Sequence, residues 1–258
     1  MAFSRLRGMQ DIYGAEAKRF QFVETTAREV FELFGFEELR TPALEEKELF
    51  VRAIGGETDV VQKEMYEFLD RSKTLLALRP EGTAGVVRAY LENNFDKTKG
   101  LCKFYYVGPM FRSERPQAGR YRQFHQIGVE QLGTDSPYSD AETLEALCVF
   151  LRRLGVKDFK VRLNNLGSFK ERSEFEVVLK KHFGPKKEGL CSDCQKRLEK
   201  NVFRILDCKN GACRGLVKKA PLIAEVLSQE SKTHFAKVCR ALKACGISYE
   251  EAPTLVRG

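Results

Sequence analysis

Several features are missing from this sequence of 258 residues, and each absence excludes a class of protein. No apolar run is long enough to span a membrane, and residues 1–5 lack the apolar core of a signal peptide. No internal repeat or low-complexity segment occurs. The three histidines are too few to build a metal site by themselves. We therefore predict a cytoplasmic globular protein with no membrane partner.

The composition narrows the remaining classes. The chain is long enough for one large domain, or for a core domain with a smaller one beside it. Its net charge of +8 favours a nucleotide or nucleic-acid partner, although many basic proteins bind neither. In a reducing compartment the eight cysteines are expected to be thiols or metal ligands rather than disulfides.

A basic hairpin is predicted at residues 104–133. Aromatic and β-branched residues 104–107 favour a strand, Gly108-Pro109 is expected to interrupt it, and residues 121–132 alternate again. Four arginines, at 112, 115, 120 and 122, would crowd one end of this hairpin. Such a cluster is suited to binding an anion, because one guanidinium group can donate two parallel hydrogen bonds to a phosphate group. A solvated basic surface with a Glu114 salt bridge is the alternative.

Other segments of the first two thirds have helix or strand periodicity. Pro80 is expected at the first helical position of its segment, with Glu81 in the first turn near the positive helix end. Ser139 and Glu142 read as a capping box. The predicted helices are 15–34, 80–91 and 139–154, and the predicted strands are 36–42, 65–70, 74–78 and 159–163.

The hairpin string carries a family resemblance. Residues 108–117 and 119–126 resemble motif 2 of the class II aminoacyl-tRNA synthetases, and in particular the histidyl-tRNA synthetases. Residues 7–12 are similar to the opening of that family, and Arg79-Pro80-Glu81-Gly82-Thr83 is similar to its RPEGT motif. The helix, strand and Pro42 resemble motif 1, which builds the family's dimer interface; an amphipathic helix packed within its own subunit is the alternative.

The resemblance implies a fold and a reaction. The fold is α+β, an antiparallel sheet flanked by helices. In the family, ATP with Mg²⁺ activates histidine to histidyl-adenylate, and the histidyl group is then transferred to tRNA(His). A homodimer is implied as well. Positioning and charge neutralisation would do most of the catalysis.

The resemblance also assigns roles to single residues. Arg112 and Arg257 would be catalytic at the α-phosphate. The ATP-binding set would be Arg112, Glu114, Arg120, Arg122 and Phe124, and the amino-acid-binding set Glu81, Thr83, Arg112, Gln126 and Glu130. Glu130 would accept an imidazole N–H, which separates histidine from analogues. Arg115 and Gln117 would meet the tRNA acceptor end.

A lysine-rich helical module is predicted from residue 168 to 246, between a catalytic core at 1–167 and a return to that core at 247–258. Its predicted helices are 169–183, 194–199, 222–227 and 231–245, and a strand is expected at 248–251. In the resembling family a helical insertion reaches the tRNA acceptor arm, so its lysines would meet phosphate; a solvated surface is the alternative.

Four cysteines of this module form two close pairs, Cys191-x2-Cys194 and Cys208-x4-Cys213. Four thiolates could hold zinc tetrahedrally. The second pair is wider than usual zinc-ribbon spacing, and the resembling family does not demand these cysteines. Zinc binding and four free thiols both stay open.

Residues 255–258 resemble the first half of a histidyl-specific motif, and no match to motif 3 or to an anticodon-binding domain follows. We therefore expect an N-terminal fragment that binds ATP or histidine weakly and is impaired in catalysis. The rival hypotheses are a regulatory synthetase paralogue of histidine biosynthesis and a non-catalytic RNA-binding module. Retention of Glu81, Arg112, Gln126 and Glu130 favours the enzyme.

Overall fold

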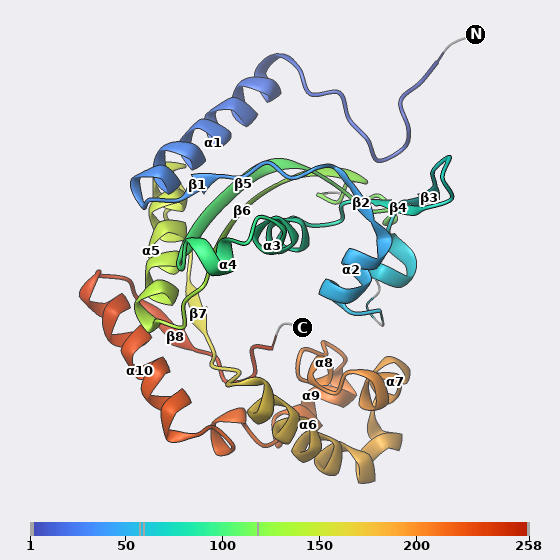
Figure 1. Cartoon of the computed structure of the whole chain (residues 1–258). Coiled ribbons are helices and arrows are strands. Elements are labelled where there is room, and N and C mark those ends of the chain that lie inside the picture. Colours follow the sequence, from blue (N-terminus) through green and yellow to red (C-terminus); the bar gives the residue numbers. More distant parts are fainter. Residues whose placement is uncertain (1–2, 57, 59, 118, 257–258) are drawn as a thin grey trace. The chain divides into compact units, whose positions relative to one another are not determined.

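The computed structural model describes residues 3–56, 58, 60–117 and 119–256, and the chain divides into two compact units after Val156. Unit 1 contains a sheet flanked by helices, which confirms the α+β prediction (Figure 1). The division after Val156 reflects contacts within each unit and does not test function. The predicted division into a catalytic core and a helical insertion after residue 167 therefore stays a prediction.

The central element of unit 1 is a long antiparallel hairpin. Strands β5 (Cys102–Phe111) and β6 (Gln123–Leu132) pair along their whole length, with β1 (Glu37–Glu38) parallel to β5 on its other side. The predicted interruption at Gly108-Pro109 is wrong. The missing N–H of Pro109 lies on the side away from β6, where β1 has already ended and the carbonyl accepts from Arg79 Nε at 2.9 Å.

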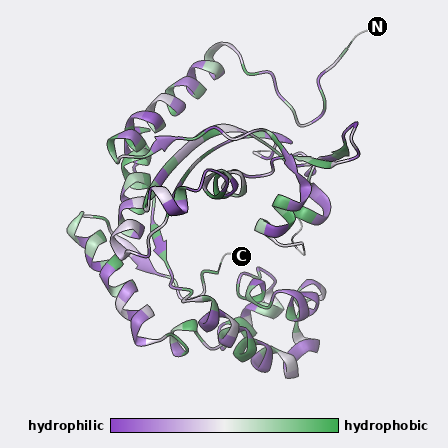
Figure 2. Ribbon diagram, viewed as in Figure 1, coloured by the Kyte–Doolittle hydropathy of each residue, from purple (hydrophilic) through white to green (hydrophobic). Residues whose placement is uncertain are grey.

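The two faces of this hairpin bury different helices, because side chains alternate across a strand. Tyr105 packs with Phe31 of α1 (Gly14–Leu33) and Phe150 of α5 (Pro137–Arg153). Tyr106 and its even-numbered neighbours pack instead on α3 (Thr83–Glu92). Along the ribbons of α1 and α5, hydrophobic and hydrophilic residues alternate (Figure 2), as expected for helices with one buried side.

A second, smaller sheet completes unit 1. Its antiparallel order is β2-β4-β3, and Phe50, Val61, Met65, Ala77 and Ala84 form the core beside it. The strands are β2 (Leu44–Glu46), β3 (Glu67–Leu69) and β4 (Leu75–Leu78), and the remaining helical segments are α2 (Lys47–Ile54), η1 (Val60–Glu64) and α4 (Phe95–Thr98).

Two predicted helix starts in unit 1 are wrong. Helix α5 begins at Pro137 after Ser136, whose Oγ accepts from the Tyr138 N–H, so Ser139 and Glu142 are not its capping box. Helix α3 begins at Thr83, so Pro80 lies before the helix rather than in its first turn. At α5 the side chain that meets a free N–H group is therefore Ser136 rather than Ser139, whereas at α3 only the position of the helix start differs from the prediction.

Unit 2 is mostly helical around its own core. The predicted helix 169–183 is confirmed, and the short strands β7 and β8 pair in parallel. Its elements are β7 (Val161–Leu163), α6 (Phe169–Phe183), η2 (Gly184–Gly189), α7 (Ser192–Lys200), α8 (Phe203–Leu206), α9 (Gly211–Val217), η3 (Ile223–Glu225), α10 (Gln229–Ala244) and β8 (Tyr249–Glu251). No helix in the described part of the chain has both the length and the apolar character needed to cross a bilayer.

One buried carboxylate joins the starts of α6 and α10. Glu171 accepts from the backbone N–H of Ser168 at 2.6 Å and of Ser228 at 2.5 Å, and from the Ser231 hydroxyl at 2.8 Å. The Ser228 N–H, followed by the Ser168 N–H, holds the pKa of Glu171 well below its usual range. A single side chain therefore satisfies donors from two helix termini.

We expect Glu171→Ala to lower the free energy of unfolding of unit 2 by about 3 kcal/mol at pH 7, because three buried donors lose their acceptor. The carboxylate pKa is depressed in the folded state, so this stabilisation is present above about pH 4.3 and is lost as the pH falls through the folded pKa. Urea unfolding from pH 7 to pH 3 measures both effects. Glu174→Ala on the same helix is the control, with an expected change below about 0.5 kcal/mol. Equal losses in both variants would contradict the prediction.

Candidate functional site

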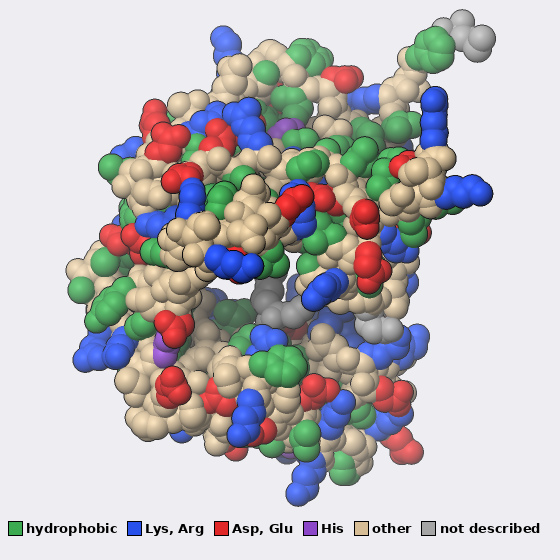
Figure 3. All heavy atoms as spheres, in the orientation of Figure 1, with side chains coloured by type: hydrophobic (Ala, Val, Ile, Leu, Met, Phe, Trp, Pro, Cys, Tyr) green, Lys and Arg blue, Asp and Glu red, His purple; other side chains and the backbone are tan. Residues whose placement is uncertain are grey.

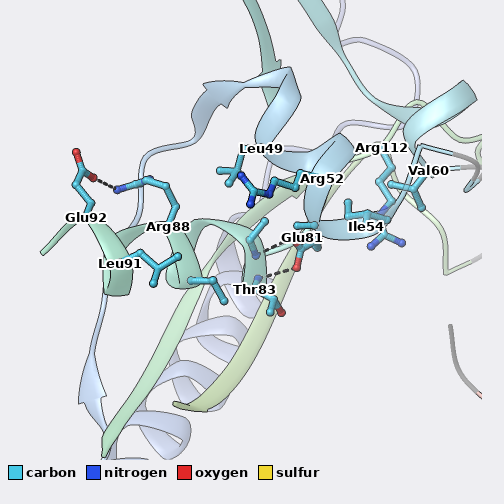
Figure 4. Close-up of a pocket in the computed structure, with 13 residues that line it drawn as sticks. Leu49, Arg52, Ile54, Val60, Glu81, Thr83, Arg88, Leu91, Glu92 and Arg112 are labelled. Atoms are coloured by element: carbon cyan, nitrogen blue, oxygen red, sulfur yellow. Dashed lines mark hydrogen bonds and ion pairs between the residues drawn. The ribbon is translucent and has the colours of Figure 1, made fainter. Parts of the chain in front are cut away.

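A cavity of about 900 Å³ in unit 1 contains three of the predicted site residues, Glu81, Thr83 and Arg112. Segments α2, η1 and α3 supply an apolar wall that includes Leu49, Ile54, Val60, Val87 and Leu91. Figure 4 shows Arg112 approaching from the end of the hairpin, with Glu81 and Thr83 at the start of α3. The cavity thus combines an apolar wall with a few convergent charged groups, as small-molecule sites do.

Glu81 is fixed by the beginning of α3. Its two carboxylate oxygens accept from the backbone N–H of Thr83 at 2.6 Å and of Ala84 at 2.9 Å. Glu81 lies one residue before the N-cap Gly82, so its predicted place in the first turn is wrong, but its carboxylate does meet the positive end of the helix as predicted. Its remaining lone pairs can accept from a guest in the cavity.

A second carboxylate lies beside the first. Thr83 Oγ1 donates to Glu130 Oε1 at 2.6 Å, which links α3 to β6. Burial raises the pKa of Glu130, and the nearby charge of Glu81 adds to the rise, whereas the Thr83 hydroxyl opposes it. Burial, followed by the Glu130 charge, raises the pKa of Tyr106 to about 12. Two adjacent carboxylates, of which Glu130 is partly buried, favour a cationic guest that carries several donors.

The pleat of the hairpin places the other predicted residues on the same face. Phe124, Gln126 and Glu130 share a parity on β6, and the ladder continues through the Arg112 N–H to Arg122 O bond of 2.9 Å. Arg112 Nε donates to Pro80 O at 2.9 Å, and its guanidinium carbon lies 5.2 Å from the centre of the Phe124 ring. Arg112 and Glu130 therefore lie on one side of the sheet, joined through Pro80, Glu81 and Thr83.

Gln126 contributes an unusual polar atom to this face. Its Oε1 is buried and has no hydrogen-bond partner among the residues that the structure describes. Buried acceptors without a partner are costly and uncommon in folded proteins. An N–H donor brought by a ligand would satisfy it.

The loop end of the hairpin holds the remaining predicted residues. Arg120 Nη1 pairs with Glu114 Oε2 at 3.1 Å, and Arg122 Nε donates to the Glu114 carbonyl at 3.3 Å. Arg115 and Gln117 line a neighbouring cavity of about 460 Å³ together with Arg120. Arg257 falls outside the described residues.

Two contacts at the site are ones that sequence reasoning missed. The Gly8 carbonyl accepts from the Arg122 N–H at 2.7 Å, so the opening segment braces the hairpin loop. A Cβ on Gly8 would lie 2.9 Å from Arg122 Cγ, and its φ of +86° also favours glycine. Arg79 Nη1 donates to the Thr41 carbonyl at 2.8 Å, and the guanidinium covers Gly108. The glycines were the only sequence signal for these contacts.

The four cysteines predicted as a metal set lie in unit 2. Their sulfurs are all within 4.8 Å of one another, and every cysteine of the chain is a free thiol. The structure therefore brings together two pairs that are separate in sequence.

Comparison with known proteins agrees with this geometry. The family described as histidyl-tRNA synthetase matches residues 8–174, which is more than half of the chain. The chain belongs to the histidyl-tRNA synthetase family. It is 47% identical to the histidine–tRNA ligase of Thermodesulfovibrio yellowstonii over 258 residues and 48% identical to that of Bacillus subtilis over 259 residues. Each match covers 100% of this chain but only 61% of the relative.

Solved structures of histidyl-tRNA synthetases share the fold. The apo enzyme of S. aureus has a TM-score of 0.78 and 36% identity, with 100% of this chain and 58% of that chain covered. A Bacillus halodurans protein described as an ATP phosphoribosyltransferase regulatory subunit/histidyl-tRNA synthetase has a TM-score of 0.69 at 22% identity, over 99% of this chain and 69% of that one. At that identity the second likeness shows the fold alone, so the ligases remain the nearer group.

The Tyr106 ring packs against two glycines, Gly82 and Gly128. A Cβ on either Gly82 or Gly128 would lie 2.3 Å from the Tyr106 ring. We expect Gly128→Ala to lower the free energy of unfolding of unit 1 by about 1–3 kcal/mol, because the ring has to leave its place beside Glu130. Urea unfolding measures this, with Gly56→Ala as the control, where the new Cβ meets only Val51 at 3.7 Å. If the two variants are equally stable, the Tyr106 packing is not as described.

Proposed function

We propose that this chain supplies the histidine and ATP sites of a histidine–tRNA ligase. The observation that carries the proposal is the convergence of Arg112, Glu81 and Glu130 on one face of the β5–β6 hairpin. The chain spans 61% of the length of the ligases it matches, so the activity of the whole protein belongs to this proposal. In the proposed reaction a histidine carboxylate oxygen attacks the α-phosphorus of ATP and pyrophosphate leaves. A ribose hydroxyl at the 3′ end of tRNA(His) then takes the histidyl group and releases AMP.

The amino-acid end of the site receives the cationic and polar groups of histidine. The α-ammonium group donates hydrogen bonds to Glu81, Thr83 and Gln126. Two observations support this role: Gln126 Oε1 has no hydrogen-bond partner among the described residues, and a backbone N–H at the start of α3 holds the Glu81 carboxylate in place. Glu130 accepts an imidazole N–H. Because Glu130 is partly buried, a side chain without that donor would leave a desolvated carboxylate unpaired, and the site would reject it.

The nucleotide end of the site uses the hairpin guanidiniums. Arg112 also faces the histidine carboxylate and neutralises charge at the α-phosphate, while Phe124 stacks on adenine and Glu114 accepts from it. The family resemblance assigns a second role at the α-phosphate to Arg257, which lies outside the described residues. Arg120 and Arg122 meet the outer phosphates. Mg²⁺ favours carboxylate and phosphate oxygens, and Glu64, which lines the cavity next to Arg120, would supply a carboxylate beside the ATP phosphates. The bound ion would screen phosphate charge.

tRNA contact is proposed for two regions. Arg115 and Gln117 line the outer cavity of the hairpin loop, where an acceptor end would approach the adenylate. The lysines of unit 2 add contacts to phosphate that do not depend on sequence. On the face shown in Figure 3, Lys and Arg side chains are intermixed with Asp and Glu, so the basic groups are not confined to one region. We place the protein in the cytoplasm, a reducing compartment in which its eight cysteines are expected as thiols or metal ligands.

The central test is calorimetric titration of the chain with histidine and ATP, singly and together. We expect Arg112→Ala to weaken ATP binding by about 10- to 100-fold, because a charge-assisted contact is worth about 1.5–3 kcal/mol. Arg40→Ala is the matched control, since Arg40 is an exposed arginine that pairs with Glu38. ATP affinity that is unchanged in Arg112→Ala would refute the proposal. It would leave the regulatory paralogue and the non-catalytic RNA-binding module as the remaining hypotheses.

A homodimer through α1 is the last part of the proposal. Three large apolar side chains of this region, Tyr13, Phe22 and Leu33, are 55–80% exposed. We expect the chain to sediment as a dimer, and Phe22→Asp to lower the dimer affinity at least about tenfold, because a charge would be buried. Val177→Asp, at an exposed apolar position of α6, is the control. A monomeric chain at micromolar concentration would contradict the proposal.

A further inference from the structure

Four cysteine sulfurs meet inside unit 2, apart from the residues of the proposed synthetase site. They belong to Cys191, Cys194, Cys208 and Cys213, and all four lie within 4.8 Å of one another. We propose that they bind one structural Zn²⁺ ion. Nothing in the proposed reaction uses these thiols, so this site stands independently of the synthetase assignment.

The sulfur spacing fits a single tetrahedral ion. With zinc–sulfur bonds of 2.3 Å, neighbouring sulfurs of a tetrahedron are about 3.8 Å apart. The Cys191 and Cys208 sulfurs are 3.8 Å apart, and the widest separation in the set exceeds the ideal edge by only about 1 Å. A disulfide would require about 2.0 Å, and all four thiols are free.

The cluster joins three helices that are too short to be stable alone. Cys191 is the N-cap of α7 and Cys194 lies in its first turn; Cys208 follows α8, and Cys213 is in α9. These helices have nine, four and seven residues. Isolated helices of this length are marginal in water, so cross-linking them through an ion replaces stability that a small core cannot supply.

The surroundings of the sulfurs match a closed structural site. Cys194 and Cys213 are fully buried in a core with Leu198, Val202 and Ile205. Cys191 and Cys208 are partly exposed, which leaves a path for the ion to enter. With all four positions taken by thiolates, no coordination site remains for catalysis.

Donors around the sulfurs compensate the charge of the site. Four thiolates with one Zn²⁺ carry a net charge of −2, which is costly in a buried place. The Cys191 N–H donates to the Cys213 sulfur at 3.2 Å, and Arg197 Nη1 donates to the Cys194 sulfur at 3.8 Å. Hydrogen bonds of this kind orient and stabilise metal ligands. Four thiols that only filled space would not need a cationic donor.

The first experiment measures the metal content of the full chain, purified under reducing conditions without chelator. We expect one zinc per chain, and we expect Cys208→Ser and Cys213→Ser to lower zinc occupancy by about tenfold or more. Cys148→Ser and Cys245→Ser, outside the cluster, are the controls and should keep the metal. Iron in place of zinc, or a disulfide between Cys191 and Cys208 in the reduced preparation, would overturn the assignment.

A second measurement on the unmodified chain covers the case in which a serine variant fails to fold. After removal of metal by a chelator, titration with Co²⁺ should give the sulfur-to-cobalt charge-transfer band and the strong visible bands of a tetrahedral four-thiolate site. Added Zn²⁺ should abolish these bands at one ion per chain. The thermal midpoint of unit 2 should fall on chelation and recover with Zn²⁺. A folded chain that takes up neither ion under reducing conditions would refute the proposal.

Discussion

The constraint on which the rest of unit 1 depends is the register of the β5–β6 hairpin. Because side chains alternate with period two, the register that buries Tyr105 against α1 and α5 also sends Tyr106, Gln126 and Glu130 towards α3. A slip by one residue would turn the core residues outward and dismantle the site at the same time. Packing energy on one face therefore fixes the positions of polar groups on the other.

The site gains its order from groups that hold one another. Glu81 is fixed by helix N–H groups, Thr83 donates to Glu130, and Arg112 donates to the Pro80 carbonyl. Each functional side chain is therefore oriented by neighbouring main chain or side chain before any ligand arrives. Such preorganised charges stabilise a developing charge without reorganisation at the moment of reaction. Within the described part of the chain, Gln126 Oε1 on the same face is buried without a hydrogen-bond partner.

In unit 2 the main question is what stabilises a small helical unit. Its helices are short, and polar cross-links supplement the apolar core. Glu171 gathers donors from the starts of α6 and α10, and the four cysteine sulfurs gather α7, α8 and α9. Both arrangements join segments that are distant in sequence, and both include buried groups, Glu171 in one and Cys194 and Cys213 in the other.

The sequence by itself determined the hairpin, the helix 169–183 and the family, because these follow from local periodicity and from a long matching string. Local spacing was wrong about Pro80, about the capping box at Ser139 and about a break at Pro109. Only the tertiary structure brought Gly8 to Arg122, packed Tyr106 between Gly82 and Gly128, and brought the four cysteine sulfurs together. These contacts join residues that are far apart in the chain. Local sequence periodicity carries no information about which distant residues come into contact in the fold.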